Sequence, residues 1–261
     1  MNDHPAVDRL GRCWSSLDAL LDDLDGDDWS TRSLCPDWTV RGVVEHLGAV
    51  EHMLLGAPPG SMADALPFEQ VGEWLESVAP LDDGEMLARY REVIAGRRDE
   101  LAAMSDADFD LPCMTPVGPG TYGRFMDVRV FDFWVHEQDI RVPLARPGHE
   151  DGPAAETALA EIEGSLGYIV GRKVGLPDGR SLTIELSGPV GRTFHVVVDG
   201  RAKQVDALDA ADVTVRTDST TFALLACGRI DPQDPIDDGR VTWVGDAEWG
   251  ERAARNFAFT M

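Results

Sequence analysis

Apolar residues recur in the first half of the chain with the spacing of helical faces. Over residues 5–24 they follow one another at steps of three and four, which is the period of one side of an α-helix. A second stripe of this kind follows Thr39, a favourable N-cap residue, and ends before the Gly- and Pro-containing stretch at residues 56–60. The pattern predicts a long helix over residues 5–24 and a second, capped by Thr39, that runs to residue 54.

Further stripes predict two more long helices and a short one. The short stripe covers residues 68–78, and a longer one covers residues 87–101 and includes Gly96, which costs some helix propensity. Prolines at positions 112, 116 and 119 break the pattern, and a last long helix is predicted over residues 121–142, where Pro143 stops it. Four long helices with short connections predict a helical bundle.

The period of the pattern changes after a linker at residues 145–153. One more helix is predicted over residues 154–170, and apolar and polar residues then alternate as in paired strands. Strands are predicted at residues 182–186, 194–198, 212–215 and 241–244, and helices at residues 220–226 and 247–257. We therefore predict an α+β protein with a four-helix bundle over residues 1–148 and a smaller α/β domain over residues 149–261.

Charge and cysteine content narrow the class of partner. The formal net charge of -24 at pH 7 repels phosphate backbones and anionic headgroups, which argues against nucleic acid and membrane partners. No segment reaches the roughly 18 apolar residues of a membrane span. The cysteines are widely spaced and form no Cys-x-x-Cys pair, as expected of reduced thiols. We expect a cytoplasmic protein, monomeric or homodimeric, that acts on small molecules.

Polar residues on apolar helix faces are the most informative feature. Asp132 and Asp139 interrupt the stripe of the last long helix, His136 lies one turn after Asp132, and His46 faces inward on the second helix. A buried carboxylate is costly unless it is paired or bound to a metal. Asp132 and His136, at positions i and i+4, lie about 6 Å apart on one face and can hold an ion together with His46. Three such ligands leave a coordination position for water or substrate, which is typical of catalytic zinc.

The same residues also have simpler interpretations. An inward histidine is often a hydrogen-bonded core residue, and an Asp with a His on one helix is often an ion pair. Asp139 either orients an imidazole of the metal site or forms a salt bridge with Arg141 or with another helix. Glu45 and Glu137 adjoin the two histidines but point about 100° away on their helices, so we expect them to be solvated.

Two sequence motifs point to a known family. The first comprises CPDWTVR at residues 35–41 with VEHL at residues 44–47, and the second is WVHEQDIR at residues 134–141. Together they resemble the mycothiol-dependent maleylpyruvate isomerase family, which belongs to the DinB-like metal-binding bundles. LLACGR at residues 224–229 and the segment 241–246 more loosely resemble the sterol-carrier-like C-terminal domain (SCP2-like) of that family.

The resemblance implies a metal site and a thiol cofactor. It implies zinc held by His46, Asp132 and His136, where Asp132 stands in place of the glutamate of the family. The shorter side chain requires the metal to shift, to be bound differently or to be held more weakly. The resemblance also implies that mycothiol, the low-molecular-weight thiol of actinobacteria, is activated for S-transfer to, or cis–trans isomerisation of, a small electrophilic substrate.

Arg229 resembles a family arginine at the end of a helix in the second domain. It is the candidate catalytic residue, since its guanidinium can bind a carboxylate of the substrate or thiol through two contacts. Its alternative role is a charge at the helix C-terminus or a member of a surface ion pair. The sequence also allows two other functions: a metal-dependent hydrolase on the same bundle, and a non-catalytic protein that binds a small ligand.

Overall fold

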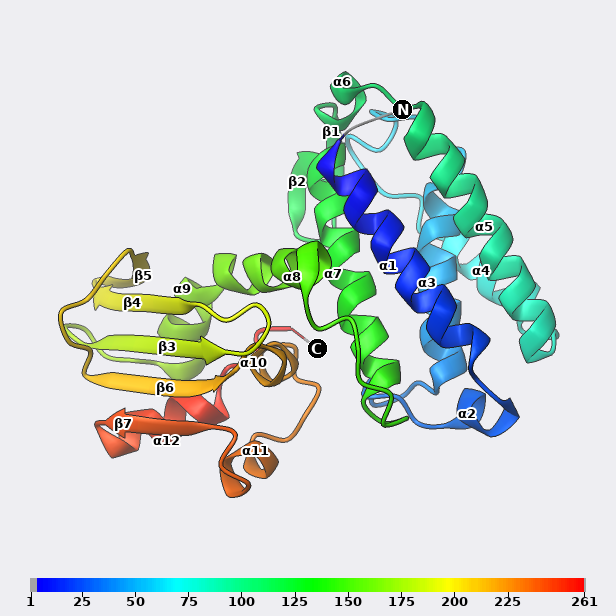
Figure 1. Cartoon of the computed structure of the whole chain (residues 1–261). Helices are drawn as coiled ribbons and strands as arrows, with labels where there is room; N and C mark the ends of the chain where they lie inside the picture. The colour runs from blue at the N-terminus through cyan, green and yellow to red at the C-terminus, as the bar shows by residue number, and fades with distance from the viewer. Residues whose placement is uncertain (1–3, 261) are drawn as a thin grey trace. The chain divides into compact units, whose positions relative to one another are not determined.

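The computed structural model describes residues 4–260, which divide after Gly148 into two compact units. The first unit contains four long helices: α1 (Pro5–Asp22), α3 (Val40–Leu54), α5 (Asp83–Ala103) and α7 (Tyr122–Arg141). Helices α1 and α3 each pack against both α5 and α7, which closes a bundle (Figure 1). The predicted bundle of four long helices is therefore confirmed.

Side-chain caps fix where the two helices with candidate ligands begin. Thr39 accepts a hydrogen bond from the backbone N–H of Gly42 at 3.3 Å and so starts α3, as predicted. Thr121 accepts from the N–H of Arg124 at 3.1 Å and starts α7. Each cap satisfies a backbone donor that has no partner within the helix. The positions of His46 and of the Asp132 and His136 pair along their helices follow from these caps.

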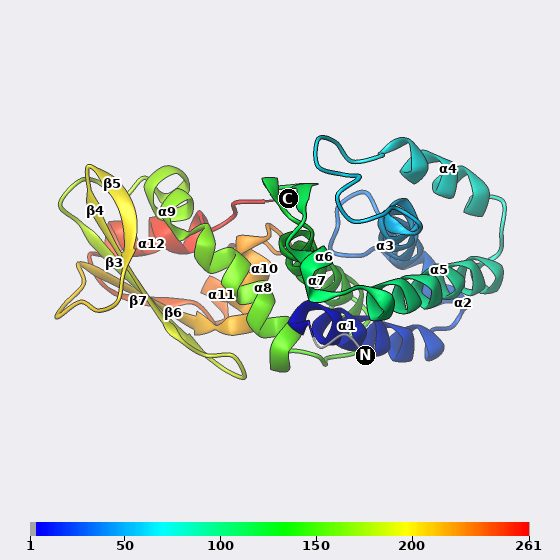
Figure 2. The same ribbon diagram turned by 90° about the horizontal axis from the view of Figure 1, so that it is seen from above.

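Shorter elements join the long helices. They are α2 (Gly26–Ser30), α4 (Glu69–Val78), α6 (Asp106–Phe109) and the antiparallel hairpin of β1 (Pro112–Thr115) and β2 (Gly118–Thr121). Figure 2 shows α4 outside the bundle, alongside α3. The sequence pattern indicated neither α2 nor the hairpin. The capping box of Asp25 supports α2, and Gly118 supplies the positive φ of 113° at the hairpin turn.

The second unit is a five-stranded sheet with helices. Its strands are β3 (Ser181–Ser187), β4 (Thr193–Asp199), β5 (Arg201–Val205), β6 (Val213–Asp218) and β7 (Thr242–Gly245), in the order β5-β4-β3-β6-β7. Its helices are α8 (Gly152–Gly164), α9 (Leu166–Tyr168), the π-helical turn η1 (Ile169–Val174), α10 (Ser219–Ala226), α11 (Gln233–Asp237) and α12 (Ala247–Arg255). Within the described residues of this unit, β3 pairs in parallel with β6, and the other neighbouring strands pair antiparallel.

Alternation along the strands places apolar side chains on one face. Leu182, Ile184 and Val215 are buried on the side where α10 and α12 pack against the sheet. The predicted strands and flanking helices are confirmed, whereas β5 and α11 were missed. Strand β5 is mostly polar, so it has no apolar alternation to detect. The helix predicted over residues 154–170 is divided among α8, α9 and η1.

Cys13, Cys35, Cys113 and Cys227 are all buried, and none of them forms a disulfide within residues 4–260. This agrees with the expected reduced thiols. In the same range, the structure contains no helix with the length and apolar character needed to cross a membrane.

Candidate metal centre

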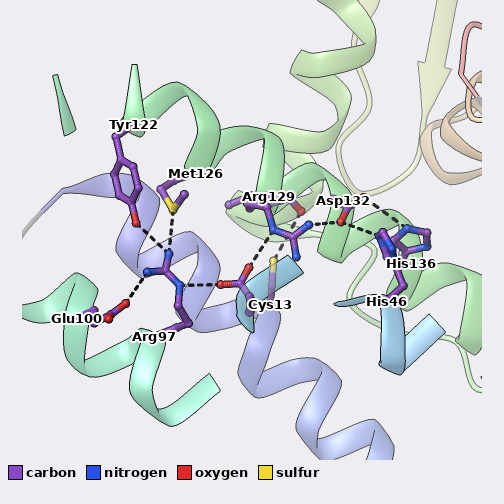
Figure 3. Close-up of polar contacts among 11 residues, drawn as sticks. Cys13, His46, Arg97, Glu100, Tyr122, Met126, Arg129, Asp132 and His136 are labelled. Carbon is purple, nitrogen blue, oxygen red and sulfur yellow. Dashed lines mark hydrogen bonds and ion pairs between the residues drawn. The ribbon is translucent and has the colours of Figure 1, made fainter. Parts of the chain in front are cut away.

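Three predicted ligands converge in the first unit. His46 comes from α3, and Asp132 and His136 come from α7 (Figure 3). Asp132 Oδ2 lies 3.6 Å from His46 Nε2, and Asp132 Oδ1 lies 3.4 Å from His136 Nε2. The two imidazole rings meet edge to face with centroids 4.9 Å apart. The sequence placed these residues on inward faces, and the structure shows that the faces meet.

The donor set fits a divalent metal such as zinc. Ligand nitrogen and oxygen atoms lie about 2.0–2.1 Å from zinc, so neighbouring ligands of a tetrahedral ion are about 3.3 Å apart. The 3.4 Å between Asp132 Oδ1 and His136 Nε2 is close to this value, and one ligand atom from each of the three residues lies within 4.8 Å of the other two. Two imidazoles and one carboxylate would leave at least one coordination position open.

The cluster is partly accessible. The side chains of His46 and Asp132 are 29% and 27% exposed, whereas that of His136 is only 7% exposed. His136 is thus fixed within the bundle, while the other two side chains lie where a small molecule can reach them. Partial exposure of two of the three side chains is typical of a site that exchanges ligands, whereas a structural metal site is enclosed by protein.

The loop before α3 places an aromatic wall beside the cluster. The ring of Trp38 lies 4.8 Å from that of His46 and 5.8 Å from that of His136, centroid to centroid. Ser33 Oγ donates to the carbonyl of Trp38 at 2.9 Å, and the N–H of Leu34 donates to the carbonyl of Asp139 at 3.1 Å. The first bond closes the loop on itself and the second attaches it to α7, so that the CPDW segment brings Trp38 against both imidazoles.

A second set of polar atoms contacts the Nδ1 side of the His136 ring, opposite the nitrogen that faces Asp132. His136 Nδ1 and Asp139 Oδ2 form a hydrogen bond of 2.8 Å, and the thiol of Cys35 donates to the same carboxylate oxygen at 3.1 Å. The 2.8 Å separation is short for two ligands of one zinc, which favours a hydrogen bond that orients the ring. The geometry favours the orienting role for Asp139, and the ion pair of Arg141 at 2.7 Å is with Glu137.

Electrostatics couples these side chains. Burial lowers the pKa of His46, against the opposing hydrogen bond and charge of Asp132. Burial also disfavours a charged His136, but the charge of Asp132 and the hydrogen bonds that the ring donates to Asp132 and Asp139 raise its pKa well above the usual range. Despite burial, the charges of Arg129 and His136 hold the pKa of the Asp132 carboxyl well below its usual range. Both shifts favour an ion pair between Asp132 and His136, and a metal bound to Nε2 would compete with the proton of that pair.

The expected solvation is wrong for Glu137 and holds only in part for Glu45. Glu137 is fully buried, and its Oε1 accepts hydrogen bonds from Ser16 Oγ at 2.6 Å and from Arg141 Nε at 2.7 Å. Glu45 is 21% exposed and forms an ion pair with Arg41 at 2.7 Å. Glu137 is buried because α7 is covered on more than one side. Helix α1, which carries Ser16, packs against the face of α7 that turns away from the histidines.

Sequence reasoning missed a row of buried charges beside the cluster. Arg129 Nη1 binds Asp132 Oδ2, and Arg129 Nε donates to Glu51 Oε1 at 2.9 Å. Glu51 Oε2 in turn accepts from Arg97 Nε at 3.0 Å. A usable signal existed for Arg129, because it precedes Asp132 by three positions and so shares its helix face. Glu51 and Arg97 carried no comparable signal.

Arg229 belongs to the second unit. It follows the C-terminal end of α10, where its Nη1 donates to the carbonyl of Cys227 at 2.9 Å and its backbone N–H donates to the carbonyl of Leu224 at 2.8 Å. These contacts match the alternative role of a charge at a helix C-terminus. Its role toward a carboxylate stays a prediction.

Two family models match the chain. The model described as "Mycothiol maleylpyruvate isomerase N-terminal domain" matches residues 10–141, and the one described as "MDMPI C-terminal domain" matches residues 156–252. The chain belongs to the mycothiol-dependent maleylpyruvate isomerase family. The resemblance seen in the sequence motifs is thereby confirmed, and all three candidate ligands of this family member lie within the first matched range.

Solved structures of the family share the fold. Crystal structures of the mycothiol-dependent maleylpyruvate isomerase and of one of its mutants each give a TM-score of 0.57 at 17% identity, covering 92% of this chain and 93% of that chain. Sterol Carrier Protein 2 from Yarrowia lipolytica gives a TM-score of 0.27 at 12% identity, covering 39% of this chain and 93% of that chain. No curated protein matches the chain.

Proposed function

We propose that this chain is a zinc-dependent enzyme that activates a low-molecular-weight thiol, mycothiol, for reaction with a small electrophile. The observation that carries the proposal is the convergence of His46, Asp132 and His136 in one partly exposed cluster. Membership of the mycothiol-dependent maleylpyruvate isomerase family supports the thiol and the isomerase class.

The chain's own residues divide the work of holding the metal. His46 and His136 would supply neutral nitrogen ligands, and Asp132 would supply a negative oxygen ligand. The hydrogen bond from His136 Nδ1 to Asp139 directs Nε2 toward the cluster, and Trp38 covers both imidazole rings. When bound, zinc lowers the pKa of a thiol and so makes the nucleophilic thiolate available near neutral pH.

The reaction would begin with addition of the thiol sulfur to an activated double bond, which forms a C–S bond and moves the π electrons onto the activating group. Rotation about the resulting single bond and elimination of the thiol would give the trans isomer and return the thiol unchanged. Protonation of the adduct instead would give an S-conjugate. Both outcomes use the same cluster, and Arg229 is the proposed binding group for a carboxylate.

Zinc content and thiol-dependent turnover test the proposal. Wild-type protein purified without added metal is expected to hold stoichiometric zinc and to lose its activity with a chelator. His46→Ala and His136→Ala should each lose at least about 100-fold in metal affinity, since loss of an outer partner alone costs about 10–100-fold. His52→Ala is the matched control, because His52 also lies on α3 but packs on Trp74, outside the cluster.

Full zinc and full activity in both cluster variants would disprove the proposal. A zinc-containing wild type that hydrolyses substrates without any thiol would support the metal-dependent hydrolase instead. A wild type that binds no ion would leave the non-catalytic ligand-binding protein as the surviving function.

A further inference from the structure

A row of buried charges runs through the bundle to the metal centre (Figure 3). Arg97 and Glu51 have side chains that are 0% exposed, and that of Arg129 is 3% exposed. The row begins at Glu100, which pairs with Arg97 Nη1 at 2.9 Å, and ends at Asp132, which binds Arg129 Nη1. It joins α5, α3 and α7, and the last two carry all three candidate ligands.

Stability alone does not account for these charges. Burying an ionised side chain costs several kcal/mol, and apolar residues of similar volume in place of such a pair are often neutral or stabilising. A bundle interior is ordinarily apolar. What a paired arginine does provide is direction, because its planar guanidinium forms hydrogen bonds along fixed lines.

We propose that Arg129 is the positioning residue of the metal centre and that it acts through Asp132. This inference rests on the proposed function. Arg129 binds Oδ2 of Asp132, and the other oxygen, Oδ1, is the one that faces His136 Nε2 at 3.4 Å. Arg129 therefore fixes the rotation of the carboxylate and assigns Oδ1 to the metal as a single-oxygen ligand.

Arg129 can do this because its own guanidinium is held. Its Nε donates to Glu51 on α3, and its Cζ lies 4.9 Å from the centre of the Phe133 ring. Glu51 is held in turn by Arg97 on α5. The Asp132 carboxylate is thus linked through Arg129 and Glu51 to α3, the helix that carries His46. In this proposal, the distance between Asp132 and His46 depends on that link. A lysine ammonium at position 129 keeps the charge but lacks the planar fork that bonds Glu51 and Asp132 together.

A double-mutant cycle on zinc affinity tests this role. The dissociation constant is measured by competition with a chromogenic chelator, and the geometry is followed by the visible absorption of the cobalt-substituted protein. Arg129→Lys is expected to weaken zinc binding by about 10–100-fold, the usual effect of losing a partner of a ligand, and to change the cobalt spectrum. In an Asp132→Ala background the same substitution should cause no further loss of zinc affinity, because position 129 then has no carboxylate through which to act on the metal.

Arg91→Lys is the matched control. Arg91 lies on α5 and, like Arg129, binds two carboxylates, but it is 39% exposed and its partners Asp18 and Asp22 belong to α1, which carries no candidate ligand. The Arg91→Lys protein should bind zinc with the affinity of the wild type. Wild-type affinity in Arg129→Lys, or an equal loss with and without Asp132, would overturn the positioning role. Absence of zinc from the wild type would overturn the proposed function itself and this inference with it.

A crystal structure of the zinc-loaded wild type provides a test that needs no variant, should Arg129→Lys not fold. Asp132 is expected to bind zinc through Oδ1 while Oδ2 stays on Arg129. Zinc coordinated by both oxygens of Asp132, or Arg129 turned away from it, would overturn the inference.

Discussion

Asp132 interacts with three neighbours at once. Its Oδ2 binds Arg129 and lies 3.6 Å from His46 Nε2, while its Oδ1 faces His136. An ionised carboxylate has about four acceptor sites, so one side chain can serve a buried cation and a metal together. Asp132 thus links the buried charge of Arg129 to both histidines of the cluster.

The thiols of Cys13 and Cys113 are unsuited to be nucleophiles. Burial raises the pKa of both, and the charge of Glu137 adds to the effect at Cys13. Because only the thiolate is reactive, these groups stay protonated and inert at neutral pH.

Alkylation tests the state of these thiols. Iodoacetamide at about pH 8, near the usual thiol pKa, should leave Cys13 and Cys113 unmodified in the native protein and label both in guanidinium. Peptide mass spectrometry gives the extent of reaction at each position. Native labelling of Cys13 at the rate of the unfolded chain would contradict the raised pKa.

Among the elements, α4 sets the outer side of α3. Trp74 of α4 donates from Nε1 to the carbonyl of Glu45 at 3.1 Å, one residue before His46. The ring packs where α3 has no side chain, since a Cβ on Gly48 would lie 2.7 Å from Trp74 Cζ2. The glycine in the helix interior therefore has a packing reason that offsets its cost in helix propensity.

Gly48→Ala should lower the free energy of unfolding by about 1 kcal/mol, because an overpacking penalty of about 1–3 kcal/mol exceeds the gain in helix propensity. Gly72→Ala on α4 is the control, since no atom lies within 4 Å of its Cβ position, and it should raise the same quantity by about 0.5–1 kcal/mol. Urea denaturation measures both. Equal stabilisation by the two substitutions would contradict the tight contact with Trp74.

For the whole molecule, the division into two units has a consequence for metal binding. The three proposed ligands all lie before the division at Gly148. Zinc that binds only the folded protein, at a free concentration about 100 times its dissociation constant, should add about 2.7 kcal/mol to the stability of the folded ligand-bearing unit.

Hydrogen exchange of the intact chain, with and without zinc, locates this effect. Protection should increase first in the amides of α3 and α7, which carry the ligands, and least in strands β3 to β7. Protection concentrated in residues 149–260 would show that zinc binds elsewhere.

Much of the fold is determined locally and could be predicted from the sequence. The three-four spacing of apolar residues gave the four long helices, Thr39 marked the start of α3, and alternation gave most of the sheet. The elements that escaped, such as the polar strand β5 and the hairpin at Gly118, lack a periodic apolar face. Their backbone hydrogen bonds come from neighbouring strands, which a local pattern does not reveal.

The sequence by itself determined that His46, Asp132 and His136 lie on inward helix faces, and the family motifs made zinc and a thiol the leading interpretation. Only the tertiary structure decided that the faces meet, that Asp139 orients His136, and that Glu137 is buried. It also decided that Arg129 and Glu51 hold Asp132. The physical reason is that periodicity reports which side of a helix is buried, whereas the partner of a buried charge is set by a different helix, distant in the chain.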